Sequence, residues 1–311
     1  MLGAGLQAIG NTPLVKLNTL VPDGAAEVWV KLEGGNPTGS YKDRMAISVL
    51  RTALEQGDVK PGERVVEYTG GSTGTALAFV SAVMGLNFTA IFSDAFSKSK
   101  QAAMEAFGAT VLIEPSVDGK ISHELAERMK QRALALAAQP RHFYADQFGA
   151  PAVRHGYASL GREIAAAMPD GFDVFCAAVG TGAMLMGTLD GLHDSGQHPD
   201  VVAVEPEESQ LLTTGVSGAH KVEGIAVFPA PPFLDRTVLK SIHVVAQDRA
   251  FEMCRQLARR EGIFGGGSTG INVCAAIDQA IALGKGHRVV TVACDNGVKY
   301  LGGHIYPASA G

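Results

Sequence analysis

Short β-branched runs alternate with helical patterns along almost the whole chain. This alternation is typical of a largely parallel sheet covered by helices, so the sequence predicts an α/β fold. The clearest predicted strands are Glu27–Leu32, Arg64–Tyr68, Phe88–Ser93, Thr110–Glu114, Val174–Val179, Val201–Glu205, Ile242–Ala246 and Arg288–Ala293. The predicted helices, where apolar residues recur at helical spacing, are Tyr41–Gln56, Thr75–Met84, Lys98–Phe107, Ser122–Ala138, Gly156–Met168, Arg249–Glu261 and Ile271–Leu283.

The length of the chain indicates more than one domain. At 311 residues it exceeds the size at which a single core usually divides, so we expect two α/β domains or one domain with a large insertion. Turn residues interrupt the alternation between Asp146 and Pro151, which marks the expected seam.

Composition and charge exclude several classes of protein. Apolar residues make up 46% of the chain and charged residues 18%, which predicts a sizeable core and argues against disorder. The net charge of −5 and the lack of a Lys/Arg-rich block argue against nucleic-acid binding. The four cysteines stand apart without metal-binding spacing, and no apolar run has the length of a membrane span. We therefore expect a soluble cytoplasmic protein with buried thiols, no metal and no membrane partner.

The turn Gly34–Arg44, which reads GGNPTGSYKDR, carries a lysine in an unusual place. Turn residues lead to Ser40, a predicted helix cap, and place Lys42 in the first turn of a helix. The positive end of the helix dipole disfavours an ammonium group there, which favours the neutral amine needed for a Schiff base or a general base. The alternative is a surface lysine paired with Asp43 or Glu33.

Three further glycine-rich turns follow predicted strands and precede helices. Thr69–Gly74 (TGGSTG) offers backbone amides and hydroxyl groups to a carboxylate. Gly180–Gly182 (GTG) has the form of a phosphate cradle, and Gly265–Gly270 (GGGSTG) offers Ser268 to a ring nitrogen or as a helix cap. Each turn alone is also compatible with a tight connection that binds nothing. We expect the turns to lie at the carboxyl ends of parallel strands, where ligands bind in open sheets.

A dinucleotide site is one alternative interpretation. It would use Gly180–Gly182 together with Glu205, which follows at the spacing of a ribose-binding acid. Leu185 stands where the third glycine of G-x-G-x-x-G is expected, which counts against this alternative.

A serine hydrolase is the second alternative. Gly70–Gly74 and Gly266–Gly270 both fit G-x-S-x-G, and Ser268, Asp295 and His304 follow the order of an α/β-hydrolase triad. A hydrolase needs only one such nucleophile turn, whereas this sequence has two. The interpretation also gives Lys42 no role.

Several segments occur together in one order along nearly the whole chain. They are Ile9–Leu17 (IGNTPLVKL), Lys31–Arg44 (KLEGGNPTGSYKDR), Glu67–Gly74 (EYTGGSTG), Gly180–Gly182, Glu223–Ile225 (EGI), Glu261–Gly270 and Cys294–Leu301 (CDNGVKYL). In this order they resemble the fold-type II enzymes that use pyridoxal 5′-phosphate (PLP), specifically the cysteine synthase and cystathionine β-synthase family.

The resemblance implies a fold and a set of site residues. It implies two open, mostly parallel twisted sheets flanked by helices, in a smaller domain of residues 43–148 and a larger cofactor-binding domain of residues 1–42 plus 149–311, and a homodimer. The catalytic residue would be Lys42, which carries PLP as a Schiff base. The cofactor would also contact Ser72, Gly180, Thr181, Gly182, Met184 and Ser268, the last at the pyridine nitrogen. The substrate would contact Thr69, Gly70, Gly71, Ser72, Thr73, Gln147 and Gly224.

Several positions depart from the family pattern. Gly70 and Ser72 replace the serine and asparagine of the carboxylate loop, and Ala183 and Met184 replace the glycine and threonine of the phosphate loop. The segment after Gly224, IAVFPAPP, lacks the family's small residues, so we expect a different pocket shape.

The resemblance also implies a reaction. Lys42 would remove the α-proton of a serine-derived amino acid, and loss of the β-substituent would give an aminoacrylate. Cysteine synthesis from O-acetylserine and sulfide is the leading expectation, and β-replacement with an amine or a larger thiol is close to it. The elimination alternative is a Ser/Thr dehydratase or a cysteine desulfhydrase.

Overall fold

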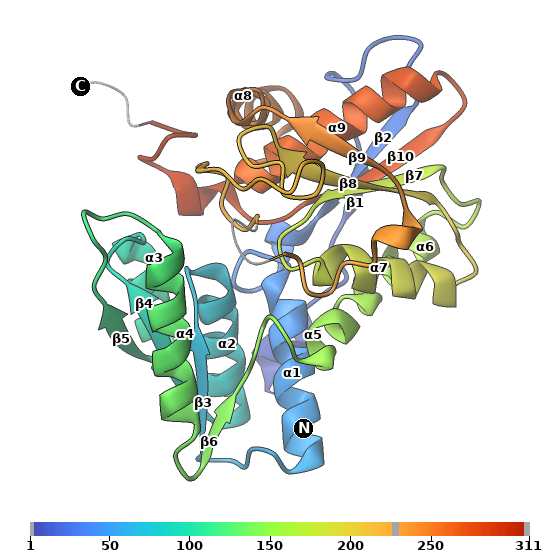
Figure 1. The fold of residues 1–311 in the computed structure, drawn as a ribbon. Helices are drawn as coiled ribbons and strands as arrows, with labels where there is room; N and C mark the ends of the chain where they lie inside the picture. The colour runs from blue at the N-terminus through green and yellow to red at the C-terminus, as the bar shows by residue number, and fades with distance from the viewer. Residues whose placement is uncertain (1–2, 226–229, 308–311) are drawn as a thin grey trace. The chain divides into compact units, whose positions relative to one another are not determined.

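The computed structural model describes residues 3–225 and 230–307 (Figure 1). By their internal contacts the residues form two compact units. The smaller consists of Met1–Ile9, Asn36–Thr38 and Lys42–Gly156, and the larger of Gly10–Gly35, Gly39–Tyr41 and Tyr157–Gly311.

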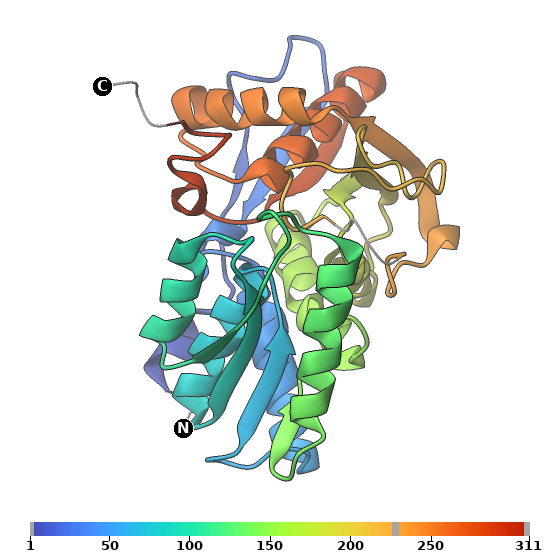
Figure 2. The ribbon, with the colours of Figure 1, turned by 60° about the vertical axis from the view of Figure 1, so that its left-hand side comes forward.

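The smaller unit is built on a four-stranded parallel sheet in the order β5-β4-β3-β6. Its strands are β3 (Arg64–Tyr68), β4 (Asn87–Ser93), β5 (Thr110–Glu114) and β6 (His142–Tyr144). Its helices are η1 (Ala4–Ala8), α1 (Lys42–Gln56), α2 (Ser72–Met84), α3 (Lys98–Ala106), α4 (His123–Ala137) and α5 (Pro151–Gly156). Figure 2 shows α4 on one face of the sheet and α2 and α3 on the other. Val66, Ile91, Leu125, Met129 and Ala133 are buried together where α4 meets the sheet.

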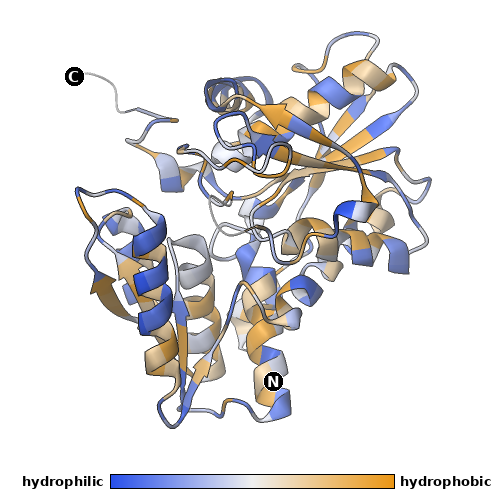
Figure 3. Cartoon of the chain, viewed as in Figure 1, coloured by the Kyte–Doolittle hydropathy of each residue, from blue (hydrophilic) through white to orange (hydrophobic). Residues whose placement is uncertain are grey.

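The larger unit contains a six-stranded sheet in the order β1-β2-β10-β7-β8-β9. Its strands are β1 (Leu14–Lys16), β2 (Glu27–Leu32), β7 (Val174–Ala178), β8 (Asp200–Pro206), β9 (Leu239–Val245) and β10 (Arg288–Ala293). Only the edge strand β1 is antiparallel to its neighbour among these strands. The strands are mostly orange in Figure 3, as expected for a sheet whose two faces are both covered.

Helices cover both faces of the larger sheet (Figure 1). The bounds of these helices are α6 (Ala158–Ala167), α7 (Ala183–Asp194), α8 (Gln247–Gln256) and α9 (Gly267–Leu283). Helix α9 packs on β10 and β7, α8 packs on α9, and α6 packs on α7 at the other face. Short turns of helix lie at η2 (Glu33–Gly35), η3 (Arg236–Val238) and η5 (Gly297–Tyr300), and a π-helical turn, η4 (Leu257–Glu261), follows α8. The predicted α/β class with two mostly parallel sheets is confirmed.

Most predicted elements are present, and the differences lie at glycine-rich starts and in short segments. Helix α2 begins at Ser72 rather than Thr75, and α9 at Gly267 rather than Ile271. Glycine and serine are poor helix formers, so the pattern predicted turns there, yet the first turn of α9 is buried and tertiary packing holds it helical. The short strands β1 and β6 were not predicted, and Gly156–Met168 is divided at Tyr157 between α5 and α6.

The contact-based units differ from the predicted boundaries of 43–148 and 1–42 plus 149–311. The first residues group with the smaller unit because η1 packs on α2, where a Cβ at Gly5 would lie 3.1 Å from the ring of Phe79. Helix α5 groups with the smaller unit because it packs on α1. The division into a smaller domain and a larger cofactor-binding domain stays a prediction.

The four cysteines, Cys176, Cys254, Cys274 and Cys294, are free and buried, whereas the sequence indicated burial from apolar surroundings for three of them. Burial raises the pKa of the first three to about 12, so these thiols stay protonated near neutral pH. Within residues 3–225 and 230–307, no helix is both long and apolar enough to cross a bilayer, and no cluster of His, Cys, Asp and Glu could hold a metal ion.

Candidate active site

Lys42 is the first residue of α1, as predicted, and its side chain is partly buried. Tyr41, rather than the predicted cap Ser40, directly precedes the helix. The next residue, Asp43, is fully buried, and its carboxylate accepts hydrogen bonds from the amide of Thr38 at 2.8 Å and from the Thr38 hydroxyl. A carboxylate in the first turn is favoured by the helix dipole, so this bond fixes the start of the helix that carries Lys42.

The turn after β3 is folded around the side chain of Thr69. Its hydroxyl oxygen accepts hydrogen bonds from the amides of Gly71 and Gly74, both at 3.1 Å, and its own amide donates to the carbonyl of Ile91. Gly71 has φ +148°, which L side chains rarely adopt, and a Cβ there would lie 2.5 Å from the buried side chain of Lys100. The turn therefore requires glycine at position 71.

The departure at Gly70 has a structural counterpart in Phe96. A Cβ at Gly70 would lie 2.8 Å from an atom of the Phe96 ring, so the ring fills the space into which a serine side chain would project. The ring of Phe96 also packs on that of Phe92, with centroids 5.3 Å apart. An aromatic ring thus replaces a hydroxyl donor at this wall of the loop.

The structure brings Gln147 to the same loop. The Thr73 hydroxyl donates to Oε1 of Gln147 at 2.8 Å, and Nε2 of Gln147 donates to the carbonyl of Tyr68 at 2.9 Å. Ser72 and Thr73 are the first residues of α2, where free amide groups and the helix dipole favour an anion. Thr69, Gly70, Gly71, Ser72, Thr73 and Gln147 therefore gather around one helix N-terminus.

In the larger unit, Gly180–Gly182 connects β7 to the N-terminus of α7. A Cβ at Gly180 would collide with the carbonyl oxygen of Gly224, so the backbones of these two predicted site residues lie in close contact. Gly182 has φ +84°, and a Cβ there would lie 2.8 Å from the amide of Leu234. The glycines are needed because other chain segments approach the loop closely.

Thr181 and Met184 lie on either side of Ala183, where α7 begins. The Thr181 hydroxyl accepts from the amide of Ala183 at 3.3 Å, and its carbonyl accepts from the amide of Phe233 at 3.1 Å. Met184 is buried, and its sulfur lies 3.7 Å from the hydroxyl of Thr188. A loop with two glycines at the N-terminus of a 12-residue helix fits a phosphate group.

Ser268 is the second residue of α9 and is buried. Asn272, one turn later, accepts from the amide of Ala178 at 2.6 Å and donates to the carbonyl of Val292 at 2.8 Å. These bonds tie the start of α9 to the carboxyl ends of β7 and β10. A buried neutral hydroxyl at such a fixed helix start is suited to a pyridine nitrogen.

Asp295 holds the turn before α9. Its oxygens accept from the amide of Gly266 at 3.2 Å and from the hydroxyl of Tyr300 at 2.6 Å, and burial raises the pKa of its carboxyl group. In a hydrolase triad this carboxylate would instead orient a histidine. The geometry therefore counts against a triad of Ser268, Asp295 and His304.

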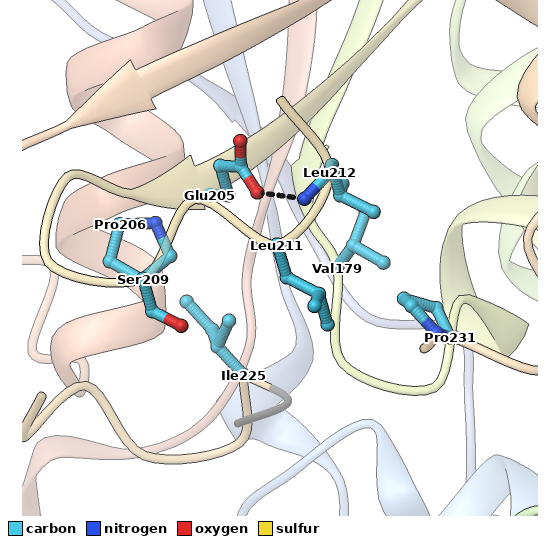
Figure 4. Close-up of a pocket in the computed structure, with 8 residues that line it drawn as sticks. All are labelled: Val179, Glu205, Pro206, Ser209, Leu211, Leu212, Ile225 and Pro231. Atoms are coloured by element: carbon cyan, nitrogen blue, oxygen red, sulfur yellow. Dashed lines mark hydrogen bonds between the residues drawn. The ribbon is translucent and has the colours of Figure 1, made fainter. Parts of the chain in front are cut away.

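A small, largely apolar pocket lies beside the phosphate loop (Figure 4). Its lining residues are Val179, Glu205, Pro206, Ser209, Leu211, Leu212, Ile225 and Pro231. Glu205 is buried and accepts from the amides of Leu212 and Thr213 at 2.6 and 2.9 Å, so its carboxylate is used within the protein rather than for a ribose. Residues 226–229 of the unusual segment after Gly224 lie outside the described residues.

A sequence model of the pyridoxal-phosphate dependent enzymes (PALP) matches residues 5–295. The chain belongs to this family. It is 38% identical over 305 residues to a cysteine synthase of Staphylococcus aureus, covering 96% of each chain. It is 34% identical over 303 residues to an O-acetylserine dependent cystathionine beta-synthase of Bacillus subtilis, again covering 96% of each. The crystal structure of an O-ureido-L-serine synthase aligns with a TM-score of 0.92 at 32% identity, over 99% of this chain and 96% of that one.

Family membership confirms the resemblance to fold-type II enzymes and the PLP cofactor, and the chain is an enzyme of the cysteine synthase type. The hydrolase and dinucleotide alternatives are wrong. The sequence did not predict three contributions to the site: Glu67 before the carboxylate loop, Asn272 on α9 and the hydrogen bond from Tyr300 to Asp295. For Glu67 there was a signal, because an acidic residue inside an otherwise apolar strand needs a specific partner.

Proposed function

We propose that this enzyme synthesises cysteine from O-acetylserine and sulfide, by β-replacement on a serine-derived amino acid. The observation that carries the proposal is the carboxylate loop, where Thr69, Thr73 and Gln147 gather at the N-terminus of α2. Such a site suits the α-carboxylate of an amino acid. The similarity to a cysteine synthase over almost the full length of both chains supports the same reaction.

Each part of the site has a proposed task. When bound, PLP supplies the electron sink for charge that develops at the substrate Cα. Lys42 holds the cofactor and moves the α-proton, and its place at a helix start favours the neutral amine. The amides of Gly180–Gly182 bind the phosphate, with Thr181 and Met184 shaping the loop. Ser268 offers a neutral hydroxyl to the pyridine nitrogen, which leaves that nitrogen largely unprotonated and suits elimination better than transamination.

The substrate residues have equally specific tasks. The amide of Gly70 and the hydroxyls of Thr69 and Thr73 surround the carboxylate, while Gly71, whose amide donates to Thr69, shapes the loop. Thr73 and Gln147 donate to the carboxylate after releasing Oε1 of Gln147 and the carbonyl of Tyr68, respectively. Ser72 replaces the family's asparagine near the cofactor ring, and its shorter side chain reaches less far. Gly224 faces the substrate with a backbone that tolerates no bulk at the neighbouring Gly180.

Other nucleophiles are the second candidate. The similarity to an O-acetylserine dependent cystathionine beta-synthase and to an O-ureido-L-serine synthase supports β-replacement with a nucleophile larger than sulfide. The departures at Gly70 and Ser72 lie in the loop that holds the substrate, so they bear on this choice. β-Elimination, as by a dehydratase or desulfhydrase, is the outcome if water rather than a nucleophile completes the reaction.

The test begins with the cofactor and ends with the product. Purified protein with PLP should absorb visible light, and O-acetylserine should change that spectrum. Products are then scored with sulfide, with a larger thiol, with an amine and with no added nucleophile. Cysteine formed fastest with sulfide supports the proposal, whereas keto acid and ammonia as the main products would replace it with a lyase. Protein that PLP cannot reconstitute would refute both.

We also propose that the enzyme is a homodimer in the cytoplasm. The family resemblance supports the dimer, and the separate, unpaired cysteines support the location. Sedimentation equilibrium of the PLP-loaded protein at several concentrations tests the dimer, and a single species with the mass of one chain would contradict it.

A further inference from the structure

We infer that Glu67 is the positioning residue of the substrate-carboxylate site: it fixes Gln147 and, through Gln147, the hydroxyl of Thr73. This inference rests on the proposed function, which assigns Thr73 and Gln147 to the substrate carboxylate. It adds a residue that does not touch the substrate and acts only through those that do.

Glu67 lies at the carboxyl end of β3, one residue before the strand ends, and its side chain is fully buried. One carboxyl oxygen accepts from the amide of Tyr68 at 2.9 Å. The other accepts from the amide of Gln147 at 2.9 Å, across 80 positions of sequence. The carboxyl group therefore joins the strand that leads into the carboxylate loop to the segment that delivers Gln147.

The hydrogen bonds continue from Gln147 to the substrate loop. With its backbone held by Glu67, Gln147 donates to the carbonyl of Tyr68 at 2.9 Å and accepts from the hydroxyl of Thr73 at 2.8 Å. Glu67, Gln147 and Thr73 thus form one chain of bonds within the smaller unit. Because each link fixes the next, a change at Glu67 reaches the substrate groups without contacting them.

The charges around Glu67 indicate that this carboxyl group has a specific task. The titratable groups that face it are Asp146, Tyr68 and Tyr144, all of them acids. Burial raises the pKa of Glu67 to about 8, and the hydrogen bonds from Gln147 and Tyr68 oppose that rise. Burying a carboxyl group among other acids costs free energy, and the hydrogen bonds from the amides of Tyr68 and Gln147 offset only part of that cost. A carboxyl group kept at such a cost indicates a specific task, which here is to hold Gln147.

The same placement predicts a pH dependence of substrate binding. The substrate carboxylate would bind to the side chain of Gln147, whose backbone amide donates to Glu67. An ionised Glu67 and the substrate carboxylate would then place two negative charges close together. Substrate binding therefore favours the neutral form of Glu67, and affinity should fall as the pH rises through about 8. Above that pH wild-type Glu67 is ionised, whereas glutamine stays neutral, so this part of the pH profile should be absent in Glu67→Gln.

The decisive variant is Glu67→Gln, which keeps the size of the side chain but presents an NH₂ group toward one of the two backbone donors. Binding of L-alanine, which has no β-leaving group, is followed by the change it causes in the visible band of the PLP-loaded enzyme. We expect its Kd at pH 7 to rise about 10-fold, because the NH₂ group cannot accept from a backbone amide and one of the two hydrogen bonds of Glu67 is lost, while the cofactor band itself is retained. The matched control is Glu63→Gln, at the residue directly before the same strand, where the carboxylate accepts from the amide of Lys60 and from Arg141. It should leave the Kd within about twofold, because the hydrogen bonds of this half-buried carboxylate do not reach Gln147 or Thr73.

A double-mutant cycle separates positioning from a general loss of stability. If Glu67 acts through Gln147, adding Glu67→Gln to Gln147→Ala should weaken L-alanine binding by no further amount. Full additivity would overturn the inference. Where Glu67→Gln does not fold, Glu67→Asp retracts the carboxyl group by one methylene and should raise the Kd in the same way.

The outcomes distinguish this inference from the proposed function. If the wild-type enzyme forms no visible band with PLP, the proposed function fails first. If the band forms and Glu67→Gln binds L-alanine as the wild type does, only the role of Glu67 is refuted. If Glu67→Gln folds but loses the band while Glu63→Gln keeps it, Glu67 supports the cofactor rather than the carboxylate site, and the inference is again wrong.

Discussion

The two loops that would hold the anionic groups are built in different ways. The carboxylate loop of the smaller unit is held by side chains, since Thr69, Glu67 and Gln147 hydrogen-bond its backbone and its neighbours. The phosphate loop of the larger unit is held by close packing of backbone, with Gly180 against Gly224. A substitution in a loop held by side chains can change which ligand the loop binds. A loop held by backbone contact tolerates substitutions at adjacent residues, but not a Cβ at the glycine that makes the contact.

This difference explains where the chain departs from its family. Ala183 and Met184 replace family residues in the phosphate loop, yet the amides of α7 and the two glycines remain in place. In the carboxylate loop, Gly70 removes a hydroxyl donor and Phe96 occupies its space. We therefore expect a PLP affinity typical of the family and a substrate preference that differs from that of its other members.

The largest expected effect on turnover comes from substituting Lys42, which belongs to neither loop and would take part in the reaction itself. Lys42→Ala should lower turnover at least about 1,000-fold, because both the covalent anchor and the general base are removed. Substrate and PLP should still bind, which equilibrium dialysis with each ligand can check.

The control for Lys42 is Lys98→Ala. Lys98 is likewise the first residue of a helix, but it is exposed at the start of α3. Turnover by this variant should match the wild type. Substantial turnover by Lys42→Ala would contradict the assignment of the catalytic lysine.

Gly180→Ala tests whether the phosphate loop is fixed by backbone packing. The new methyl group would collide with the carbonyl oxygen of Gly224, which belongs to the backbone and cannot turn aside. PLP affinity should fall more than about 10-fold, as is typical when a buried site has to move to relieve overpacking. Fluorescence titration of the apoenzyme with PLP measures this loss.

Gly35→Ala is the matched control in the same unit. The nearest atom to a Cβ there is Cγ2 of Thr12 at 3.8 Å, an ordinary contact, so PLP affinity should not change. Equal affinities for Gly180→Ala and the wild type would mean that the phosphate loop adapts more readily than its packing indicates.

Gly70→Ser tests the side-chain-built loop. Its Cβ would lie 2.8 Å from the Phe96 ring, but a ring at the edge of the loop can rotate. We expect an effect smaller than that of Gly180→Ala, with O-acetylserine affinity reduced about threefold to 10-fold and PLP affinity unchanged. Adding Phe96→Ala should restore the affinity, since the hydroxyl then has both space and a carboxylate to bind. A double variant no better than Gly70→Ser would show that Phe96 does not set this wall.

The sequence predicts the parts of the site that depend on backbone pattern. The alternation of strands and helices placed three of the turns after strands, but Gly265–Gly270 follows the helical turn η4, so the expectation of a preceding strand was wrong there. Lys42 and the four turns could be identified because their spacing is local. The network around Glu67 and Gln147 could not be predicted, since it joins residues 80 positions apart and depends on how β3 and the segment after β6 pair. The helix starts at Ser72 and Gly267 were placed too late for a similar reason, because burial rather than propensity decides them.

Thr181→Val should cause the smallest loss of ligand affinity among these variants. Compared with Thr69→Val, it tests whether side chains matter less in the phosphate loop than in the carboxylate loop. The Thr181 hydroxyl accepts from the amide of Ala183 at 3.3 Å, a long hydrogen bond at the start of α7. Valine keeps the shape but removes the acceptor, and losing one such hydrogen bond costs about 1 kcal/mol, or roughly fivefold in PLP affinity. In the carboxylate loop, Thr69→Val removes an acceptor shared by two amides, at 3.1 Å each, so its effect on O-acetylserine affinity should be larger. If Thr181→Val proved the more damaging of the two, the phosphate loop would depend on side chains as much as the carboxylate loop does.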